Sequence, residues 1–294
     1  MTDSFKEKFR QAVAETEAVV YSYLPEETGH QKTIFEAMNY SVKAGGKRLR
    51  PLLMREVYRL FGGNGPEIGP FMAAMEMIHT SSLIHDDLPC MDNDEYRRGK
   101  LTTWKAYGYD MAGHALMIYA FEVASKAFTM GADPAKVGRA IGILAEKTGI
   151  YGMIGGQTVD VELTGKAVPR EKLDFIYRLK TGALLEASMM IGAVLAGASD
   201  EEIREVETMA SEVGLAFQIQ DDILDVTSTQ EELGKPVLSD EKNQKTTYVT
   251  LEGLEKAKQD VKEISDRAAG RLAGLPGKNE FLYDIIEMLV NRKN

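Results

Sequence analysis

The amino-acid sequence predicts an all-α protein. Apolar residues recur at three- and four-residue spacing along most of the chain, which is the period of a helix with one buried face. No stretch shows sustained two-residue alternation, so amphipathic strands are not expected. At 294 residues the chain can bury a large core, as one big domain or two modest ones. Neither a break in composition nor a fixed-period repeat marks a linker.

Each expected helix is bounded by recognisable start and stop residues. Pro51 fits the first turn of a helix, and Asp133-Pro134 is an N-cap followed by proline at the first helical position. Ala183–Ala198 is apolar almost all round, with Glu186 its only charge, which places it at the centre of the core. The stretches expected to be helical are Asp3–Leu24, Gln31–Ala44, Pro51 to the glycines at 62–65, Ile68–Leu88, those opened by Asp133-Pro134, Pro169 and Asp200, Ala183–Ala198, Glu252–Ala273 and Asn279–Arg292.

Composition and charge exclude several classes of function. A net charge of -10 and a pI near 5.1 argue against a nucleic-acid partner, which would need a basic face. The single cysteine, Cys90, excludes an internal disulfide and fits a reducing compartment. The charged N-terminus is unlike a signal peptide, and no uninterrupted apolar run is long enough for a membrane span. We therefore expect a soluble, cytoplasmic protein.

The stretch GLAFQIQDDILD, Gly214–Asp225, ends an apolar helix with three carboxylates. Asp221 and Asp225 are four residues apart and Asp222 and Asp225 three apart, so on a helix all three share one face. Desolvating such like charges costs on the order of several kcal/mol unless a cation joins them. Oxygen ligands without Cys or His favour magnesium over zinc. A lone motif of this kind is more often a solvated helix end, but the chain carries a second one.

The second acidic cluster, HDDLPCMD, contains Asp86, Asp87 and Asp92. Asp86 and Asp92 would lie about 120° apart on a continuous helix. Pro89 cannot continue the helical hydrogen bonds, so the helix should end near it and let Asp92 fold back towards Asp86. His79 lies seven residues before Asp86, on the same helical face, and taken alone is more often a core histidine than a ligand.

Basic residues cluster beside glycines at several points. GGKRLRP places Lys47, Arg48 and Arg50 after a flexible glycine pair and before a helix N-terminus, an arrangement suited to phosphate. The other basic groups are Arg97-Arg98 after the Asp86 cluster, Lys180 beside Thr181, and Lys235 and Lys245 after the Asp221 cluster. Each alone could be a solvated surface charge. Together with two acidic clusters they indicate magnesium-bridged diphosphates, and the glycine loops typical of nucleotide sites are missing.

These motifs, in this order, resemble those of the trans-isoprenyl diphosphate synthases of the polyprenyl synthetase family, of the bacterial farnesyl/geranylgeranyl diphosphate synthase type. The resemblance runs nearly the whole chain through GGKRLRP, EMIHTSSLIHDDLPCMDND, RRGK, GGQTVD, RLKTGALLEAS, FQIQDDILD, ELGKP and KTTY. It implies an isoprenoid synthase fold, a single polyprenyl synthetase domain over residues 1–294 around a central cavity. It also implies that the two acidic motifs face each other across the cavity mouth, and that the protein is a homodimer.

The resemblance implies a magnesium-dependent condensation of isopentenyl diphosphate with an allylic diphosphate (dimethylallyl, geranyl or farnesyl), releasing diphosphate. The implied metal ligands are Asp86, Asp87, Asp92, Asp221, Asp222 and Asp225. The residues implied to bind isopentenyl diphosphate are Lys47, Arg50, His79 and Arg98. Those implied to hold the allylic diphosphate are Arg97, Lys180, Lys235 and Lys245, with Thr181 and Gln218 beside them. Catalysis is expected to depend most on Asp86, Asp87, Asp92, Arg97, Lys180, Asp221 and Asp222.

Product length is expected to depend on the cavity below the first acidic motif. Similar farnesyl synthases usually have an aromatic residue five positions before that motif, where this chain has Ser81, followed by Ser82. One helical turn deeper lie Met77 and Ile78, and a turn of about 5.4 Å is comparable to one added isoprene unit. We therefore expect geranylgeranyl diphosphate, stopped by Met77 or Ile78. If another side chain fills the space at Ser81, the product is farnesyl diphosphate.

Departures from the family pattern lie outside the motif carboxylates and the diphosphate-binding positions, and two other functions are weighed separately. His114 stands where the family usually has aspartate, and Leu101 and Trp104 where it usually has proline and histidine. A class I terpene cyclase would share the fold and the first motif, but the intact second motif and GGKRLRP argue against it. A non-catalytic regulatory subunit would typically lose one acidic motif, and this chain keeps both.

Overall fold

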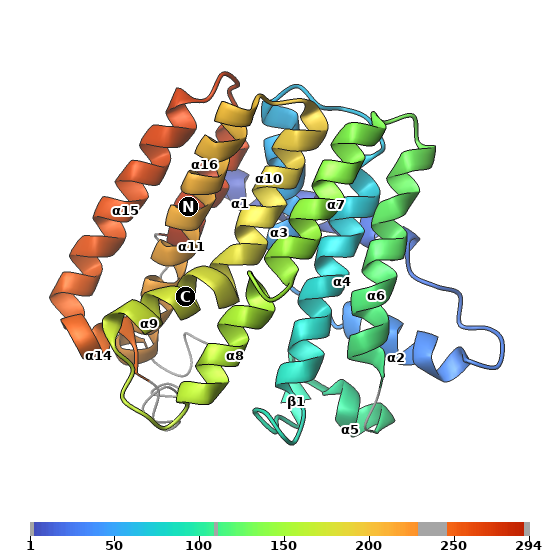
Figure 1. The fold of residues 1–294 in the computed structure, drawn as a ribbon, viewed down its shortest axis with the longest axis horizontal. Coiled ribbons are helices and arrows are strands. Elements are labelled where there is room, and N and C mark those ends of the chain that lie inside the picture. Colours follow the sequence, from blue (N-terminus) through green and yellow to red (C-terminus); the bar gives the residue numbers. More distant parts are fainter. Residues whose placement is uncertain (1–2, 109–110, 229–245, 291–294) are drawn as a thin grey trace. The chain divides into compact units, whose positions relative to one another are not determined.

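The computed structural model describes residues 3–108, 111–228 and 246–290. Within these ranges nearly all regular structure is helical and the only strands form one short pair, so the all-α prediction is confirmed (Figure 1). The chain divides into two compact units, residues 1–55 with 64–141 and residues 56–63 with 142–294. Two helices, α3 (Leu49–Leu60) and α7 (Pro134–Thr148), therefore contribute residues to both units.

The first unit is built around one buried helix. Its elements are α1 (Asp3–Ser22), α2 (Lys32–Val42), α4 (Ile68–Asp86), β1 (Tyr96–Arg97), β2 (Lys100–Leu101), α5 (Thr103–Tyr107), α6 (Ala112–Ser125) and the 3-10 turn η1 (Lys126–Thr129). Helix α4 is buried along nearly its whole length and packs along α6 and against α1 (Figure 1). It ends at Asp86, three residues before Pro89, as the sequence predicted.

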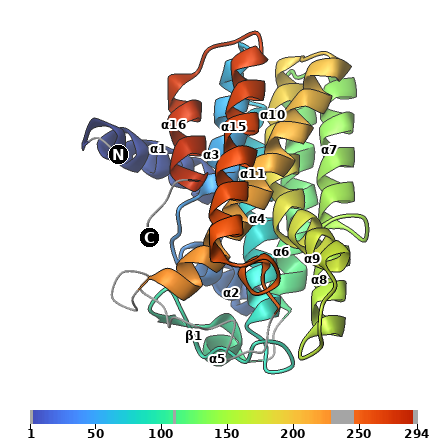
Figure 2. The same cartoon turned by 90° about the vertical axis from the view of Figure 1, so that its left-hand side faces the viewer.

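The second unit contains the apolar helix that the sequence placed at the core. Its elements are α8 (Met153–Leu163), α9 (Arg170–Ile176), the π-helical segment η2 (Tyr177–Gly182), α10 (Ala183–Ala196), α11 (Asp200–Thr227), α14 (Tyr248–Glu252), α15 (Leu254–Gly274) and α16 (Glu280–Val290). Helix α10 is buried from Ala183 to Leu195, and α11 packs against both α10 and α15 (Figure 2). The one charged residue of α10, Glu186, is ion-paired with Lys147, which also contacts Glu207 at 2.7 Å.

Helix starts follow the predicted capping chemistry. The backbone N–H of Ala135 donates to Asp133 Oδ1 at 2.9 Å, which satisfies one of the unpaired donors at the start of α7. Ser199 and Glu202 form a reciprocal capping box at the start of α11. The end of α3 belongs to the second unit, where the Asn279 side chain donates to the carbonyl and a carboxylate oxygen of Glu56, each at 3.0 Å.

Elements α9, η2 and α10 follow one another without a break and form one apolar helical run. By length and composition alone, Arg170–Ala196 could cross a membrane. Its most apolar window is 83% buried inside the protein, which is the behaviour of a core helix in a soluble fold. It therefore gives weak support at most for a span.

Candidate active site

The first acidic motif is organised by a turn that follows α4. The backbone N–H of Asp92 donates to the carbonyl of Asp86 at 2.9 Å, so the chain folds back after Pro89 as predicted. Asp87 is buried, and both its oxygens accept from Arg97 Nε, at 2.8 and 2.9 Å. Burial raises the pKa of the Asp87 carboxyl, and the hydrogen bonds from Arg97 oppose that rise. Asp87 therefore orients Arg97 as well as lying in the motif.

A short hairpin places the two arginines after this motif. Tyr96 pairs with Leu101 and Arg97 with Lys100, leaving Arg98-Gly99 as a two-residue turn. Both turn residues have positive φ, 54° and 75°, as the tightest hairpin turns require. Arg97, at the end of the strand, donates to Asp87, while Arg98, in the turn, donates to the carbonyl of Gly45, so the hairpin directs the two arginines to different partners.

Four basic residues of the first unit line one pocket of about 380 Å³. The basic residues are Lys47, Arg48, Arg50 and Arg98. Gly46, Glu76 and His79 also line the pocket. A Cβ at Gly46 would lie 2.8 to 3.0 Å from the Arg98 guanidinium, so the glycine lets Arg98 approach the loop. The structure thus brings together all four residues that the resemblance implies for isopentenyl diphosphate.

Arg50 and His79 lie next to each other in the lining of this pocket. Arg50 Nη1 lies 3.4 Å from His79 Nε2, while the Arg50 Nε is buried without a hydrogen-bond partner. Burial lowers the pKa of Arg50 to about 10. Burial also lowers the pKa of His79 well below its ordinary value, and the charges of Arg50 and Arg98 lower it further. A neutral imidazole beside an unsatisfied guanidinium donor suits an anion with several acceptor oxygens.

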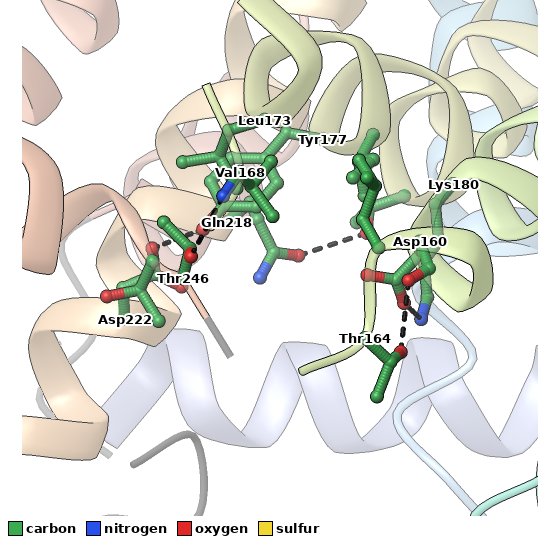
Figure 3. A pocket seen from close by; sticks show the side chains of 13 residues that line it. Asp160, Thr164, Val168, Leu173, Tyr177, Lys180, Gln218, Asp222 and Thr246 are labelled. Atoms are coloured by element: carbon green, nitrogen blue, oxygen red, sulfur yellow. Dashed lines mark hydrogen bonds and ion pairs between the residues drawn. The ribbon is translucent and has the colours of Figure 1, made fainter. Parts of the chain in front are cut away.

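The second unit has its own polar pocket, of about 110 Å³ (Figure 3). Lys180 contacts Asp160 at 2.5 Å, and Thr181 donates to Gln218 Oε1 at 3.0 Å. Asp222 also lines this pocket. The structure therefore gathers Lys180, Thr181, Gln218 and Asp222, which the resemblance implies for the allylic diphosphate and its metals.

Asp222 is held from two directions. Tyr177 donates its hydroxyl to Asp222 Oδ2 at 2.5 Å, and the backbone N–H of Tyr248 donates to the same oxygen at 2.8 Å. Asp222 and Asp225 are buried, and Asp221 is half-buried on the same helix. The sequence analysis assigned no role to Tyr177, Tyr248 or Asp160. Two of them lie in motifs that could have pointed to them: Asp160 ends GGQTVD and Tyr248 ends KTTY.

The π-helical segment η2 carries Lys180 and Thr181, and glycines surround it. A Cβ at Gly156 of α8 would lie 2.3 Å from the backbone N of Lys180. A Cβ at Gly214 of α11 would lie 3.1 Å from the Cα of Gly182. Helix α8 therefore approaches η2 at a distance that only glycine allows, and α11 approaches it closely enough that a Cβ would fit only with a small shift, so both helices help to fix the position of Lys180.

Not every predicted site residue can be located. Lys235 and Lys245 lie outside the described residues. The predicted contact of the two acidic motifs across a cavity relates the two units and stays a prediction. Within the described ranges, no three His, Cys, Asp or Glu side chains are gathered closely enough to hold a metal ion. The donor set itself, carboxylate oxygens with no thiolate, still fits magnesium.

Comparison with known proteins decides the family. The sequence model of polyprenyl synthetases matches residues 31–285. The chain belongs to the polyprenyl synthetase family. The family match extends over both units of this polyprenyl synthetase.

Its relatives include synthases with products of different length. A farnesyl diphosphate synthase of Geobacillus stearothermophilus is 43% identical over 294 residues, covering 99% of this chain and 97% of the relative. A chloroplastic geranylgeranyl pyrophosphate synthase of Capsicum annuum is 47% identical over 249 residues, covering 83% of this chain and 67% of the relative. These matches confirm the prediction of a trans-prenyltransferase of the farnesyl/geranylgeranyl diphosphate synthase class.

Solved structures share the fold. An FPP/GFPP synthase from Zymomonas mobilis has a TM-score of 0.86 at 33% identity, covering 99% of this polyprenyl synthetase and 100% of that chain. A geranyltransferase from Helicobacter pylori, solved with magnesium and isoprenyl diphosphate, has a TM-score of 0.81 at 30% identity, covering 99% and 98% of the two chains. The predicted isoprenoid synthase fold is confirmed by these likenesses.

Proposed function

We propose that this polyprenyl synthetase binds isopentenyl diphosphate in the pocket of the first unit. The single observation that carries the proposal is the buried, unpartnered Nε of Arg50 in a pocket that Lys47, Arg98 and His79 also line. A buried guanidinium donor without an acceptor is costly, and a diphosphate oxygen would satisfy it. Lys47 and Arg98 would neutralise the remaining charge of the ligand.

The allylic diphosphate is assigned to the two acidic motifs, with Arg97 and Lys180. Asp86, Asp87, Asp92, Asp221, Asp222 and Asp225 would hold magnesium, which when bound neutralises charge developing on the leaving diphosphate. The carbon–oxygen bond of the allylic substrate breaks and its electron pair stays with the diphosphate. The alkene of isopentenyl diphosphate then forms the new carbon–carbon bond, and the released diphosphate accepts the proton that is lost. The chain's own contribution is to position both substrates in a dry pocket.

The proposed product is geranylgeranyl diphosphate. Ser81 is fully buried, and its hydroxyl donates to the carbonyl of Ile78 on its own helix at 2.7 Å. Ser82 likewise donates to the carbonyl of His79 at 2.9 Å. Both serines therefore fold onto α4, while Met77 and Ile78, also fully buried, present bulk one turn earlier. This supports a floor at Met77 or Ile78 rather than at Ser81.

Product chromatography after incubation with labelled isopentenyl diphosphate, magnesium and each allylic primer tests the proposal. A twenty-carbon product supports it, and a fifteen-carbon product as the sole one contradicts the assignment of length while keeping the class. A terpene cyclase would instead release hydrocarbon from farnesyl or geranylgeranyl diphosphate alone. A regulatory subunit would show no magnesium-dependent turnover as a purified chain.

The proposed assembly is a homodimer. On α6 of the first unit, Ile118 is 72% exposed, and Met111, just before the helix, is 64% exposed. These apolar side chains lie seven residues apart, hence on one face, and a second copy could cover them. Sedimentation analysis of the purified chain distinguishes a dimer from a monomer. The cytoplasmic location stays a prediction, because relatives include chloroplastic enzymes.

A further inference from the structure

Arg48 lies between two residues proposed to bind diphosphate, yet its side chain is fully buried and already bonded. Its Nη1 donates to Glu76 at 2.7 Å, and its Nη2 donates to the carbonyl of Val42 at 2.7 Å. Its Nε donates to Glu17 at 3.0 Å, and Nη2 also reaches the hydroxyl of Tyr21 at 3.0 Å. Each guanidinium nitrogen is therefore engaged by the protein itself, on α1, on α4 and at the end of α2.

The backbone at Arg48 is strained. Its φ is +47°, in the left-handed region that is unfavourable for a residue with a Cβ. Such a conformation persists only where the surrounding contacts determine it. At Arg48 these contacts are the hydrogen bonds of its own guanidinium, which hold the backbone between Lys47 and Arg50 in place. The bend that turns the loop into α3 is thus held by the guanidinium of Arg48.

Glu76 is the other half of this arrangement. Of the described residues that line the pocket of the first unit, it alone is acidic, and it is buried against Arg48. A carboxylate in an anion-binding pocket opposes binding by simple electrostatics. Its presence is explained if its task is to anchor Arg48, because a buried charge pair has a defined geometry that specifies local structure.

We propose that Arg48 is a positioning residue: its guanidinium, anchored by Glu76, fixes the loop that presents Lys47 and Arg50 to diphosphate, and it does not itself contact the ligand. This inference rests on the proposed function, which assigns isopentenyl diphosphate to the pocket. A positioning role for Arg48 differs from direct contact with the ligand in one measurable respect. A ligand role predicts that removing the Glu76 charge strengthens binding, while a positioning role predicts that it weakens binding.

The test is Glu76→Gln, with calorimetric titration of isopentenyl diphosphate and of inorganic diphosphate into the full chain. We expect the dissociation constant for isopentenyl diphosphate to rise about tenfold, because the charge-assisted anchor of Arg48 is lost. In turnover assays the KM for isopentenyl diphosphate should rise by a similar factor, with the KM for the allylic substrate within about twofold of the unaltered value. Unchanged or tighter binding of isopentenyl diphosphate overturns the proposal.

Arg48→Lys provides a second measurement if Glu76→Gln does not fold. It keeps the positive charge but cannot reproduce the planar set of bonds, so the same loss of affinity is expected. Retention of full affinity by this variant overturns the proposal. The control is Lys43→Met, which removes an exposed positive charge from the neighbouring loop without touching the Arg48 contacts and should leave affinity unchanged.

The unaltered chain separates this inference from the proposed function. If it binds neither isopentenyl diphosphate nor diphosphate, the proposed function fails and so does the inference that rests on it. If it binds both and the variants bind equally well, the proposed function stands and the positioning role is wrong.

Discussion

At the scale of single residues, the departures from the family pattern acquire local explanations. The indole N–H of Trp104 donates to the carbonyl of Asp94 at 2.8 Å, and the hydroxyl of Thr102 donates to the same oxygen at 2.8 Å. Trp104 therefore ties the start of α5 to the loop that carries the first acidic motif. His114 packs edge-on against His85, with ring centroids 4.9 Å apart. The Nε2 of His85 is buried without a hydrogen-bond partner, and the imidazole at position 114 contacts His85 through its ring rather than as a carboxylate acceptor.

Ser81→Phe should shorten the product. The side chain is fully buried on the face of α4 that leads towards Met77, and a phenyl ring there would block the space that one further isoprene unit needs. Chromatography of the products should show a shift from twenty to fifteen carbons. Met77→Ala is the matched change in the opposite direction and should add longer products. The same product distribution from both variants would show that the floor lies elsewhere.

The lowered pKa of His79 predicts a pH-dependent stability. Because the folded chain disfavours protonation of this imidazole, the unfolded chain binds more protons below the ordinary histidine pKa of about 6.5. Its contribution to stability is therefore complete above that pH and is lost as the pH falls below it. Thermal unfolding of His79→Gln between pH 7.5 and 5 should depend less on pH than that of the unaltered chain.

The exposed His30 provides the control for this measurement. His30→Gln should leave the pH dependence as it is in the unaltered chain. Equal loss of stability in the His79 variant and the unaltered chain would mean that burial and the charges of Arg50 and Arg98 do not lower the pKa of His79 as described.

At the scale of elements, the close approach of α8 to η2 predicts a large effect from a small change. Gly156→Ala would place a Cβ 2.3 Å from the backbone N of Lys180, so η2 must shift. We expect a loss of about 1–3 kcal/mol in the free energy of unfolding and a raised KM for the allylic diphosphate. Urea denaturation and steady-state kinetics measure the two effects.

Gly270→Ala is the matched control for that change. Gly270 lies within α15, and a Cβ added there would meet no described atom within 4 Å outside its own helix. Alanine there should stabilise the helix by about 0.5–1 kcal/mol and leave both KM values unchanged. A Gly156→Ala variant that behaves in the same way would contradict the tight packing of η2.

Most long helices were predictable, but α6 and α8 were not among the expected stretches, and neither were the short irregular elements. The periodicity of Asp3–Leu24 and Ile68–Leu88 is sustained over several turns, and α1 and α4 end within two residues of those bounds. The strands β1 and β2 have two residues each, too few to show alternation. The π-helical turn of η2 depends on packing by Gly156 and Gly214 from other helices, which no local pattern encodes. For the same reason Tyr177, whose role depends on Asp222, was missed.

The site residues divide along similar lines. Asp86, Asp221 and Lys47 carry charge in motifs that the sequence displays directly. Arg48 is visible as part of GGKRLRP, but its pairing with Glu76 is identified only when the fold brings residues 28 positions apart into contact. The charged residues of a motif can therefore be read from the sequence, whereas the long-range contacts that hold the motif in place cannot.

At the scale of the whole molecule, the assignment of both acidic motifs to one ligand has a thermodynamic consequence. Magnesium with inorganic diphosphate should raise the melting temperature. At a hundredfold excess of ligand over the dissociation constant, the free energy of unfolding should increase by about 2.7 kcal/mol. Asp86→Asn in the first unit and Asp221→Asn in the second should each abolish nearly all of that shift. Differential scanning calorimetry with and without the ligands makes the measurement.

Asp266→Asn is the control for these two variants, because its exposed carboxylate pairs only locally with Lys262. It should show the full ligand-induced shift. If each of the two motif variants instead keeps about half of it, the motifs bind ligand independently and the shared-ligand assignment is wrong.

The contact of Asn279 with Glu56 also bears on how the protein is made. The two residues are 223 positions apart, and ribosomes add roughly 5–20 residues per second. Glu56 therefore leaves the ribosome on the order of 10 to 45 s before its partner. During that interval the apolar run Arg170–Ala196 also emerges, with the length and composition of a segment that membrane-insertion machinery can accept. The second unit cannot close before α16 has been translated, so a nascent chain stalled short of α16 would leave this apolar run without its final packing partners.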